Sequence, residues 1–226
     1  MKGKLIVIEG TDCSGKETQS NLLVKKLNEL GYKTEKFCFP NYESATGRIL
    51  AGPYLGKPDY GEGYFSEGAS NVDPKVASLY FAADRKYNIS KIEEKLNQGI
   101  NVVVDRYIDS NFAHQGSKIY DDKKRKLMFN YLEKLEYGLL ELPRADITIF
   151  LYMPIEAAKI LKANRPEKPD QHEMDEKYLL NSEKVYLQLA KMHKYIKIDC
   201  AVENKPQPIE KIHDVVLSKI LKKLAK

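Results

Sequence analysis

The sequence has few of the residues that build metal centres and disulfide frameworks. Its 226 residues include only 3 cysteines and 4 histidines, and the histidines do not cluster. Cys13, Cys38 and Cys200 lie far apart and form no C-x-x-C pair. This spacing argues against a structural zinc site and a disulfide framework, and it favours a reducing compartment. Tryptophan is absent, and no apolar run reaches the length needed to span a membrane.

The composition also limits the classes of partner. No signal-peptide pattern precedes the first strand-like segment, so we expect a cytoplasmic protein without a membrane partner. The formal net charge of +5 is mild and scattered, which suits a small anionic substrate but does not predict a nucleic-acid partner. With 42% hydrophobic residues and no internal repeat or linker, we expect a single domain over residues 1–226.

A glycine loop near the N-terminus carries the clearest chemical signal. Gly10–Lys16 fits the phosphate-binding pattern G-x-x-x-x-G-K, although Glu17 stands where Ser or Thr is usual. An apolar, β-branched run at 4–9 precedes the loop, and a helical pattern at 18–30 follows it. Strand, glycine loop and helix form the context that this motif requires.

The residue types of the loop match phosphate binding. Gly10 and Gly15 permit backbone conformations that bring N–H groups close to a polyphosphate. The positive end of the following helix attracts the same anion, and Lys16 adds a point charge. A chance match remains the alternative, but the flanking strand and helix make nucleotide binding our working hypothesis.

Strand and helix patterns alternate along the whole chain. This alternation predicts an α/β fold with a parallel sheet covered by helices on both faces, and ligands at the carboxyl ends of the strands. We expect strands at 4–9, 33–39, 100–105, 146–152 and 195–199, and helices at 18–30, 46–55, 74–98, 122–137, 154–163, 173–191 and 208–224. In the long helix at 74–98 we expect the following side chains to face inward: Val76, Leu79, Tyr80, Ala83 and Tyr87.

An acidic residue ends the predicted strand at 100–105, and an arginine follows it directly. Asp105 lies where P-loop enzymes place the acid that holds Mg²⁺, but it is also suited to capping the next turn. Arg106 can reach a transferring phosphoryl group, or it can form a surface ion pair. Ser110 and Gln115 follow within ten positions and strengthen the functional interpretation.

Three further segments permit both a functional and a structural interpretation. Phe81 and Arg85 share one helix face, where they can hold a nucleotide base or simply pack as a core ring with a snorkelling arginine. Phe39-Pro40 and Arg48 follow the second strand and either line a pocket or turn the chain. The charged, proline-broken stretch at 164–171 is either a lid carrying Arg165 or a solvated connection.

Together these segments resemble the thymidylate kinase family of P-loop nucleoside monophosphate kinases, in the family's order and over essentially the whole chain. The matching motifs are Ile8–Asp12 with Gly15-Lys16 and Thr18-Gln19, Phe39-Pro40, Thr46–Arg48 with Tyr54-Leu55, Phe81–Arg85, Asp105–Ser110 with Ala113 and Gln115-Gly116, and Ile198–Ala201. The resemblance implies a three-layer P-loop NTPase fold with a five-stranded parallel sheet and a small lid at about 164–172. It further implies transfer of the ATP γ-phosphate to dTMP with Mg²⁺, and a homodimer packed through long helices.

The resemblance also implies roles for individual residues. Asp12, Lys16, Arg106 and Arg165 would be catalytic, and Asp105 and Glu17 would serve the metal. The donor phosphates would lie against Gly10, Thr11, Asp12, Cys13, Ser14, Gly15, Lys16, Glu17 and Thr18. The acceptor would contact Asp12, Phe39, Pro40, Arg48, Leu55, Phe81, Arg85, Arg106, Ser110, Asn111, His114 and Gln115.

The sequence departs from the family pattern at three positions. Glu17 replaces the hydroxyl that ordinarily ligates Mg²⁺, Tyr42 stands where a phosphate-contacting arginine is frequent, and His114 replaces an aromatic residue. Cys13 leaves the loop without an arginine, so the lid would supply one through Arg165. Two alternatives stay open: a kinase for another nucleoside monophosphate or a deoxynucleoside, and a nucleotide-binding module without catalysis.

Overall fold

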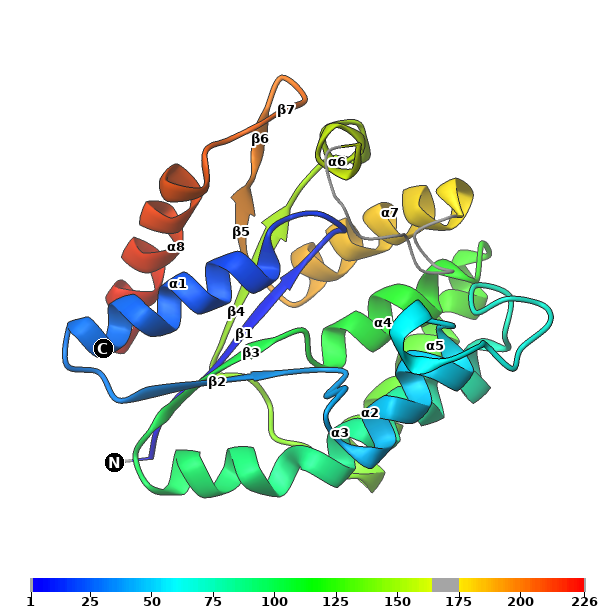
Figure 1. Ribbon diagram of the computed structural model, residues 1–226, viewed down its shortest axis with the longest axis horizontal. Helices are drawn as coiled ribbons and strands as arrows, with labels where there is room; N and C mark the ends of the chain where they lie inside the picture. The colour runs from blue at the N-terminus through cyan, green and yellow to red at the C-terminus, as the bar shows by residue number, and fades with distance from the viewer. Residues whose placement is uncertain (1, 164–174, 226) are drawn as a thin grey trace.

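A computed structural model describes residues 2–163 and 175–225 of the chain. Its centre is a parallel sheet of five strands in the order β2-β3-β1-β4-β5 (Figure 1). The strands are β1 (Leu5–Gly10), β2 (Thr34–Cys38), β3 (Asn101–Asp105), β4 (Ile147–Tyr152) and β5 (Ile196–Asp199). A small antiparallel hairpin, β6 (Ala201–Val202) with β7 (Lys205–Pro206), follows the sheet.

Helices surround this sheet as the alternating pattern predicts. The longer ones are α1 (Lys16–Glu29), α3 (Pro74–Asn97), α4 (Ile108–Ser117), α5 (Asp122–Glu133), α6 (Ile155–Lys162), α7 (Glu176–Met192) and α8 (Ile209–Leu224). Shorter turns are α2 (Ala45–Ile49), the π-helical turns η1 (Leu50–Tyr54) and η3 (Lys134–Leu139), and the 3₁₀ turn η2 (Pro58–Tyr60). Within the described residues, no helix is long and apolar enough to cross a membrane.

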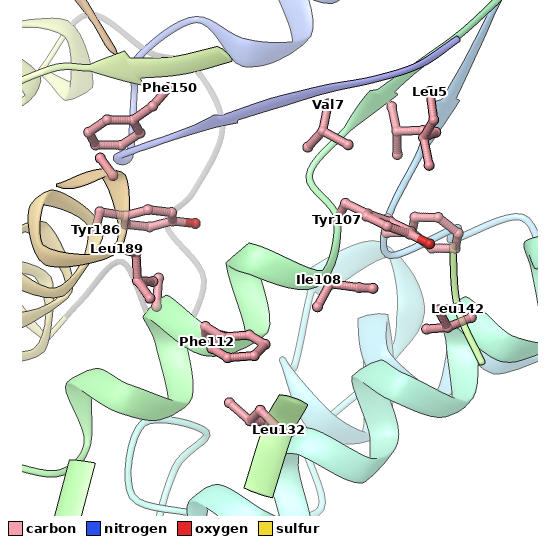
Figure 2. Close-up of a cluster of buried hydrophobic side chains, with 14 of the residues drawn as sticks. Leu5, Val7, Tyr107, Ile108, Phe112, Leu132, Leu142, Phe150, Tyr186 and Leu189 are labelled. Atoms are coloured by element: carbon pink, nitrogen blue, oxygen red, sulfur yellow. The ribbon is translucent and has the colours of Figure 1, made fainter. Parts of the chain in front are cut away.

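Two apolar cores lie on opposite faces of the sheet because successive side chains of β1 point in opposite directions. Leu5 and Val7 pack on one face with side chains from α3, α4, α5 and α7 (Figure 2). Ile6 and Ile8 pack on the other face with side chains from α1, α6 and α8. The three inner strands β1, β3 and β4 are therefore largely buried on both sides, as their apolar sequences predict, whereas the edge strands β2 and β5 are partly exposed.

The carboxyl ends of β1, β2 and β3 meet at one edge of the sheet. Ile8 of β1 pairs with Asp105 of β3, and Cys38 of β2 pairs with the same residue. The glycine loop follows β1 at this edge, and Arg106 follows β3. Strand register thus places the predicted phosphate loop beside Asp105 and Arg106.

The predicted inward face of α3 is wrong in this structure. Val76, Leu79, Tyr80, Ala83 and Tyr87 are exposed. The opposite face is buried although it includes four polar residues, and it carries Ala77, Ser78, Ala82, Asp84, Arg85, Asn88, Ile89, Ile92 and Leu96. The usual rule that apolar residues mark the inner face fails here because the buried polar groups pair with one another and line a cavity.

Candidate active site

A cavity of about 560 Å³ opens at the carboxyl edge of the sheet. It is lined by most of the predicted site residues: Asp12, Cys13, Ser14, Gly15, Lys16, Glu17, Thr18, Phe39, Pro40, Leu55, Phe81, Arg85, Asp105, Arg106, Ser110, Asn111, His114 and Gln115. Gly10 and Thr11, also predicted for the site, do not line this cavity. Arg48 is exposed on α2 and does not line the cavity. Arg165 and the expected lid at 164–172 lie outside the described residues.

The backbone of the glycine loop follows a path that its residue types permit. Gly15, the N-cap of α1, has φ of 78°, in the left-handed region that favours glycine. A Cβ atom on Gly10 would lie 2.4 Å from Ser14 Oγ and 2.6 Å from Leu151 O, so only glycine fits there. The Thr11 hydroxyl joins the loop to β4 by donating to Met153 O at 2.7 Å and accepting from Met153 N at 2.9 Å.

Lys16 is buried beneath this loop. Its Nζ donates to Gly10 O at 3.1 Å and to Thr11 O at 2.8 Å. Burial and the nearby Arg106 charge lower the pKa of Lys16 to about 8, against the opposing effects of Asp12 and Asp105. The ammonium group therefore has little compensation from the protein, and an anionic ligand at the loop would stabilise its charged form.

Arg106 occupies a turn between β3 and α4 with φ of 60°, an uncommon value for a residue with a side chain. Its Nη2 lies 3.4 Å from Asp12 Oδ1, and its Nη1 lies 3.4 Å from His114 Nε2 and 3.5 Å from the Tyr186 hydroxyl. Burial raises the pKa of Asp12, but Arg106 and Lys16 outweigh it and lower that pKa to about 2. Asp12 is consequently a carboxylate at neutral pH.

Two carboxylates face the cavity beside the glycine loop. Asp105 ends β3, and Glu17 is exposed in the first turn of α1. Burial raises the pKa of Asp105, Lys16 and Arg106 lower it, and the negative charge of Glu17 raises it again. Among the described residues no group of three or more potential ligands forms a protein-only metal cage. Mg²⁺ does not require one, because it is commonly held by one or two carboxylates with water and substrate phosphates.

The far end of the cavity is formed by α3 and α4, and Glu136 of η3 pairs with a side chain of each. Arg85 is buried and donates from Nε to Glu136 Oε2 at 3.0 Å and from Nη2 to Glu136 Oε1. Asn111 Nδ2 also donates to Glu136 Oε1, at 2.7 Å. Both amide atoms of Gln115 and Oδ1 of Asn111 are buried without a hydrogen-bond partner in the described part of the chain. Buried polar atoms are rarely left unpaired, so these atoms indicate a ligand.

The segment at 41–46, beside the cavity, is fixed to α3 by Asp84. Its carboxylate accepts hydrogen bonds from Asn41 N at 2.8 Å, Thr46 Oγ1 at 2.7 Å and Ser44 Oγ at 3.1 Å. The Lys57 ammonium lies 5.2 Å from the centre of the Tyr42 ring, and both residues line the cavity.

Four cavity residues received no site role in the sequence analysis: Lys36, Cys38, Lys57 and Asp84. Glu136 was missed as well, because it is 51 residues from Arg85 and only tertiary packing brings the pair together. Glu136 did carry one signal, since it is a charged residue within an amphipathic helical pattern beside the apolar Leu135.

Comparison with known proteins agrees with this geometry. Residues 8–215 match the family model described as Thymidylate kinase. A thymidylate kinase of Schizosaccharomyces pombe is 33% identical over 184 residues, which cover 81% of this chain and 77% of that protein. A thymidylate kinase of Homo sapiens is 34% identical over 159 residues, which cover 70% of this chain and 65% of that protein.

A solved structure of thymidylate kinase from Candida albicans superposes with a TM-score of 0.74 at 24% identity, covering 98% of this chain and 92% of that one. This likeness concerns the fold, a P-loop sheet with helices on both faces. The extent of the family match, from the glycine loop into α8, decides the assignment. The chain belongs to the thymidylate kinase family.

Proposed function

We propose that the protein transfers the γ-phosphate of ATP to dTMP and releases dTDP and ADP. One observation carries this proposal beyond family membership: a single cavity joins the glycine loop to buried, unpaired amide atoms of Gln115 and Asn111. The edge of thymine presents an N–H donor between two carbonyl acceptors. A glutamine amide offers one acceptor and two donors, so Gln115 can match that edge.

In this proposal the glycine loop binds the donor phosphates. Backbone N–H groups of residues 10–18 and the N-terminus of α1 surround the anion, and Lys16 turns from the loop carbonyls to the β- and γ-phosphates. Cys13 and Ser14 belong to the same loop, and Ser14 Oγ is buried without a partner in the described residues, so it is available to a phosphate oxygen.

Asp105 and Glu17 would hold Mg²⁺ at the mouth of the loop. Both carboxylates line the cavity, and the negative charge of Glu17 contributes to the raised pKa of Asp105, which supports placing a cation near them. When bound, Mg²⁺ neutralises charge on the triphosphate and orients it. Glu17 thus takes the place of the hydroxyl that is usual at this position.

The acceptor would lie with its base at the far end and its phosphate near Arg106. Phe81 stacks on thymine, Gln115 and Asn111 bind its polar edge, and Arg85 is held toward the base by Glu136. Phe39, Pro40, Leu55, Ser110 and His114 complete the lining. The exposed position of Arg48 does not support its role at the acceptor phosphate, so we infer that Lys57 supplies that charge instead.

Catalysis would then rest on positioning and charge, because phosphoryl transfer asks little covalent chemistry of a protein. Arg106 bridges the donor and acceptor phosphates, and Asp12 fixes its guanidinium at 3.4 Å. Arg165, outside the described residues, would add a second positive charge from the lid at 164–172.

We further propose a homodimer formed through α3. Its exposed apolar stripe consists of Val76, Leu79, Tyr80, Ala83 and Tyr87, which recur at helical spacing on one face. A second copy of the chain would cover this stripe, and it would explain why these residues are apolar. We also propose that the chain forms a single domain and is located in the cytoplasm. The three cysteines are present as thiols, which is consistent with that location.

An acceptor screen tests the function directly. Purified protein is incubated with ATP, Mg²⁺ and one nucleoside monophosphate or deoxynucleoside at a time, and ADP release is measured. We expect dTMP to give the highest kcat/KM. Equal turnover of dTMP, dUMP and dCMP would remove the thymine-specific assignment, and binding of ATP and dTMP without any ADP release would show a non-catalytic module.

A further inference from the structure

Glu9, in β1 directly before the glycine loop, has a completely buried carboxylate. Its Oε1 accepts hydrogen bonds from Tyr107 N at 2.8 Å and Ser110 N at 3.1 Å. Its Oε2 accepts from Ser110 Oγ at 2.7 Å and from the Tyr186 hydroxyl at 3.3 Å. One side chain therefore joins the central strand to the start of α4 and to α7.

These contacts enclose the backbone of Arg106. Its own N–H donates to Ile8 O at 3.0 Å, and the next N–H, of Tyr107, donates to Glu9. Two consecutive residues of β1 thus hold both sides of a turn whose φ of 60° is unfavourable for arginine. The N-cap residue of α4, Tyr107, provides no side-chain cap, and Glu9 supplies one from another strand by accepting from Ser110 N.

The same carboxylate reaches the Arg106 side chain through a hydroxyl. Tyr186 OH lies 3.3 Å from Glu9 Oε2 and 3.5 Å from Arg106 Nη1. The Tyr186 ring stacks on Phe150 with centroids 5.6 Å apart and planes 14° apart, and Figure 2 shows the two rings side by side. The hydroxyl consequently has a fixed position between the carboxylate and the guanidinium.

We propose that Glu9 is a positioning residue that aims the Arg106 guanidinium at the phosphates, through the turn backbone and through the Tyr186 hydroxyl. This inference rests on the proposed bridging role of Arg106. The competing interpretation is that Glu9 only stabilises the fold. The two differ because a positioning role predicts a loss of kcat that depends on Arg106, whereas a structural role predicts a loss of stability that does not.

The Glu9 carboxylate changes its protonation near neutral pH, so its contacts to the Arg106 turn depend on pH in that range. Burial and the charge of Asp109 raise the pKa of Glu9 to about 7, against hydrogen bonds from Ser110 and Tyr107 and the charge of Arg106. Protonation on Oε1 would cost one of its two backbone N–H contacts, and protonation on Oε2 would require the Ser110 or Tyr186 hydroxyl to accept where it now donates. The other ionisable groups acting on this carboxylate are Lys16 from α1, Tyr186 from α7 and Tyr195 before β5.

The first test combines Glu9→Gln with Arg106→Ala in a double-mutant cycle. Glutamine keeps the shape but donates where the carboxylate accepted, so we expect kcat to fall by about 100-fold, the cost of misplacing a catalytic group by about 1 Å. The KM for ATP should change much less. In the Arg106→Ala background, adding Glu9→Gln should cause little further loss. Wild-type kcat in Glu9→Gln, or multiplicative losses in the double variant, would overturn the proposal.

Two further variants separate positioning from folding. Tyr186→Phe removes only the bridging hydroxyl and keeps the ring stacked on Phe150, so it should lower kcat even if Glu9→Gln fails to fold. Glu183→Gln is the matched control, because Glu183 also accepts from a tyrosine hydroxyl (Tyr152, 2.7 Å) and a helix-start N–H (Ile155, 3.0 Å). This control should retain wild-type kcat, and wild-type kcat in Tyr186→Phe would contradict the proposal.

A readout without substrate separates this inference from the proposed function. The side-chain Nε–H resonance of Arg106, assigned with Arg106→Lys, should shift or broaden in Glu9→Gln and stay unchanged in Glu183→Gln. If wild-type protein phosphorylates no acceptor, the proposed function fails and the resonance still tests the positioning. An active wild type with an unchanged Arg106 resonance in Glu9→Gln would instead refute the positioning role alone.

Discussion

The guanidinium of Arg85 and the carboxylate of Glu136 form an ion pair that is almost completely buried at the base end of the cavity. Burial lowers the pKa of Arg85, but Glu136 outweighs it and the net pKa is raised, so the guanidinium stays charged. A buried arginine with a single acidic partner depends strongly on that partner.

We expect Glu136→Ala to destabilise the protein by about 3–5 kcal/mol, because it leaves the Arg85 charge buried without compensation. The measurement is urea unfolding, with and without dTMP. Glu133→Ala serves as the control, since its ion pair with Arg144 is largely exposed and should contribute about 1 kcal/mol or less. Equal stability losses in the two variants would show that the buried Arg85–Glu136 pair contributes no more to the free energy of unfolding than the exposed pair.

ATP affinity should depend on the protonation of Lys16. Its pKa is lowered to about 8, so the ammonium group is charged below that pH and becomes neutral as the pH rises through it. We expect the affinity for ATP to fall above about pH 8, by up to about tenfold per pH unit. Calorimetric titration across this range measures it.

Lys16→Met should bind ATP weakly and with little pH dependence around pH 8. If the wild-type and Lys16→Met affinities changed in parallel with pH, another group would be responsible.

We expect Lys57, and not Arg48, to contribute to binding of the acceptor phosphate. Lys57 lines the cavity, whereas Arg48 is exposed outside it. We expect Lys57→Ala to raise the KM for dTMP by about 10-fold or more, since a hydrogen bond to a charged group contributes about 1.5–3 kcal/mol. Arg48→Ala should leave this KM near the wild-type value. Steady-state kinetics with saturating ATP decides, and the reverse order of effects would restore Arg48 to the site.

The exposed stripe on α3 predicts a second copy of the chain. Leu79 is 50% exposed in the single chain, and Leu79→Glu should convert dimer to monomer in sedimentation velocity because it buries a charge in an apolar interface. Leu30→Glu, at a residue that is 49% exposed at the end of α1, is the matched control and should stay dimeric. A wild-type protein that sediments as a monomer at all concentrations would remove the proposal.

The sequence alone predicted much of the architecture. The five predicted strands match those of the sheet to within a residue or two, and the helical patterns at 18–30, 74–98 and 208–224 correspond to α1, α3 and α8. The helix α4 was not predicted, because its buried residues include polar side chains such as Asp109, Ser110 and Asn111, which weaken any apolar period. Local patterns succeed where burial is apolar and fail where the site itself is buried.

By itself the sequence determined the phosphate loop, the acidic and basic residues that end the third strand, and the family resemblance. Gly10, Gly15 and Lys16 are residue types that a local backbone path requires, and that information is carried by neighbours in the chain. Only the tertiary structure decided which face of α3 is buried, that Glu136 holds Arg85, and that Glu9 encloses the Arg106 turn. The two side-chain pairings join residues 51 and 98 positions apart, and pairing at that range is set by packing rather than by local pattern.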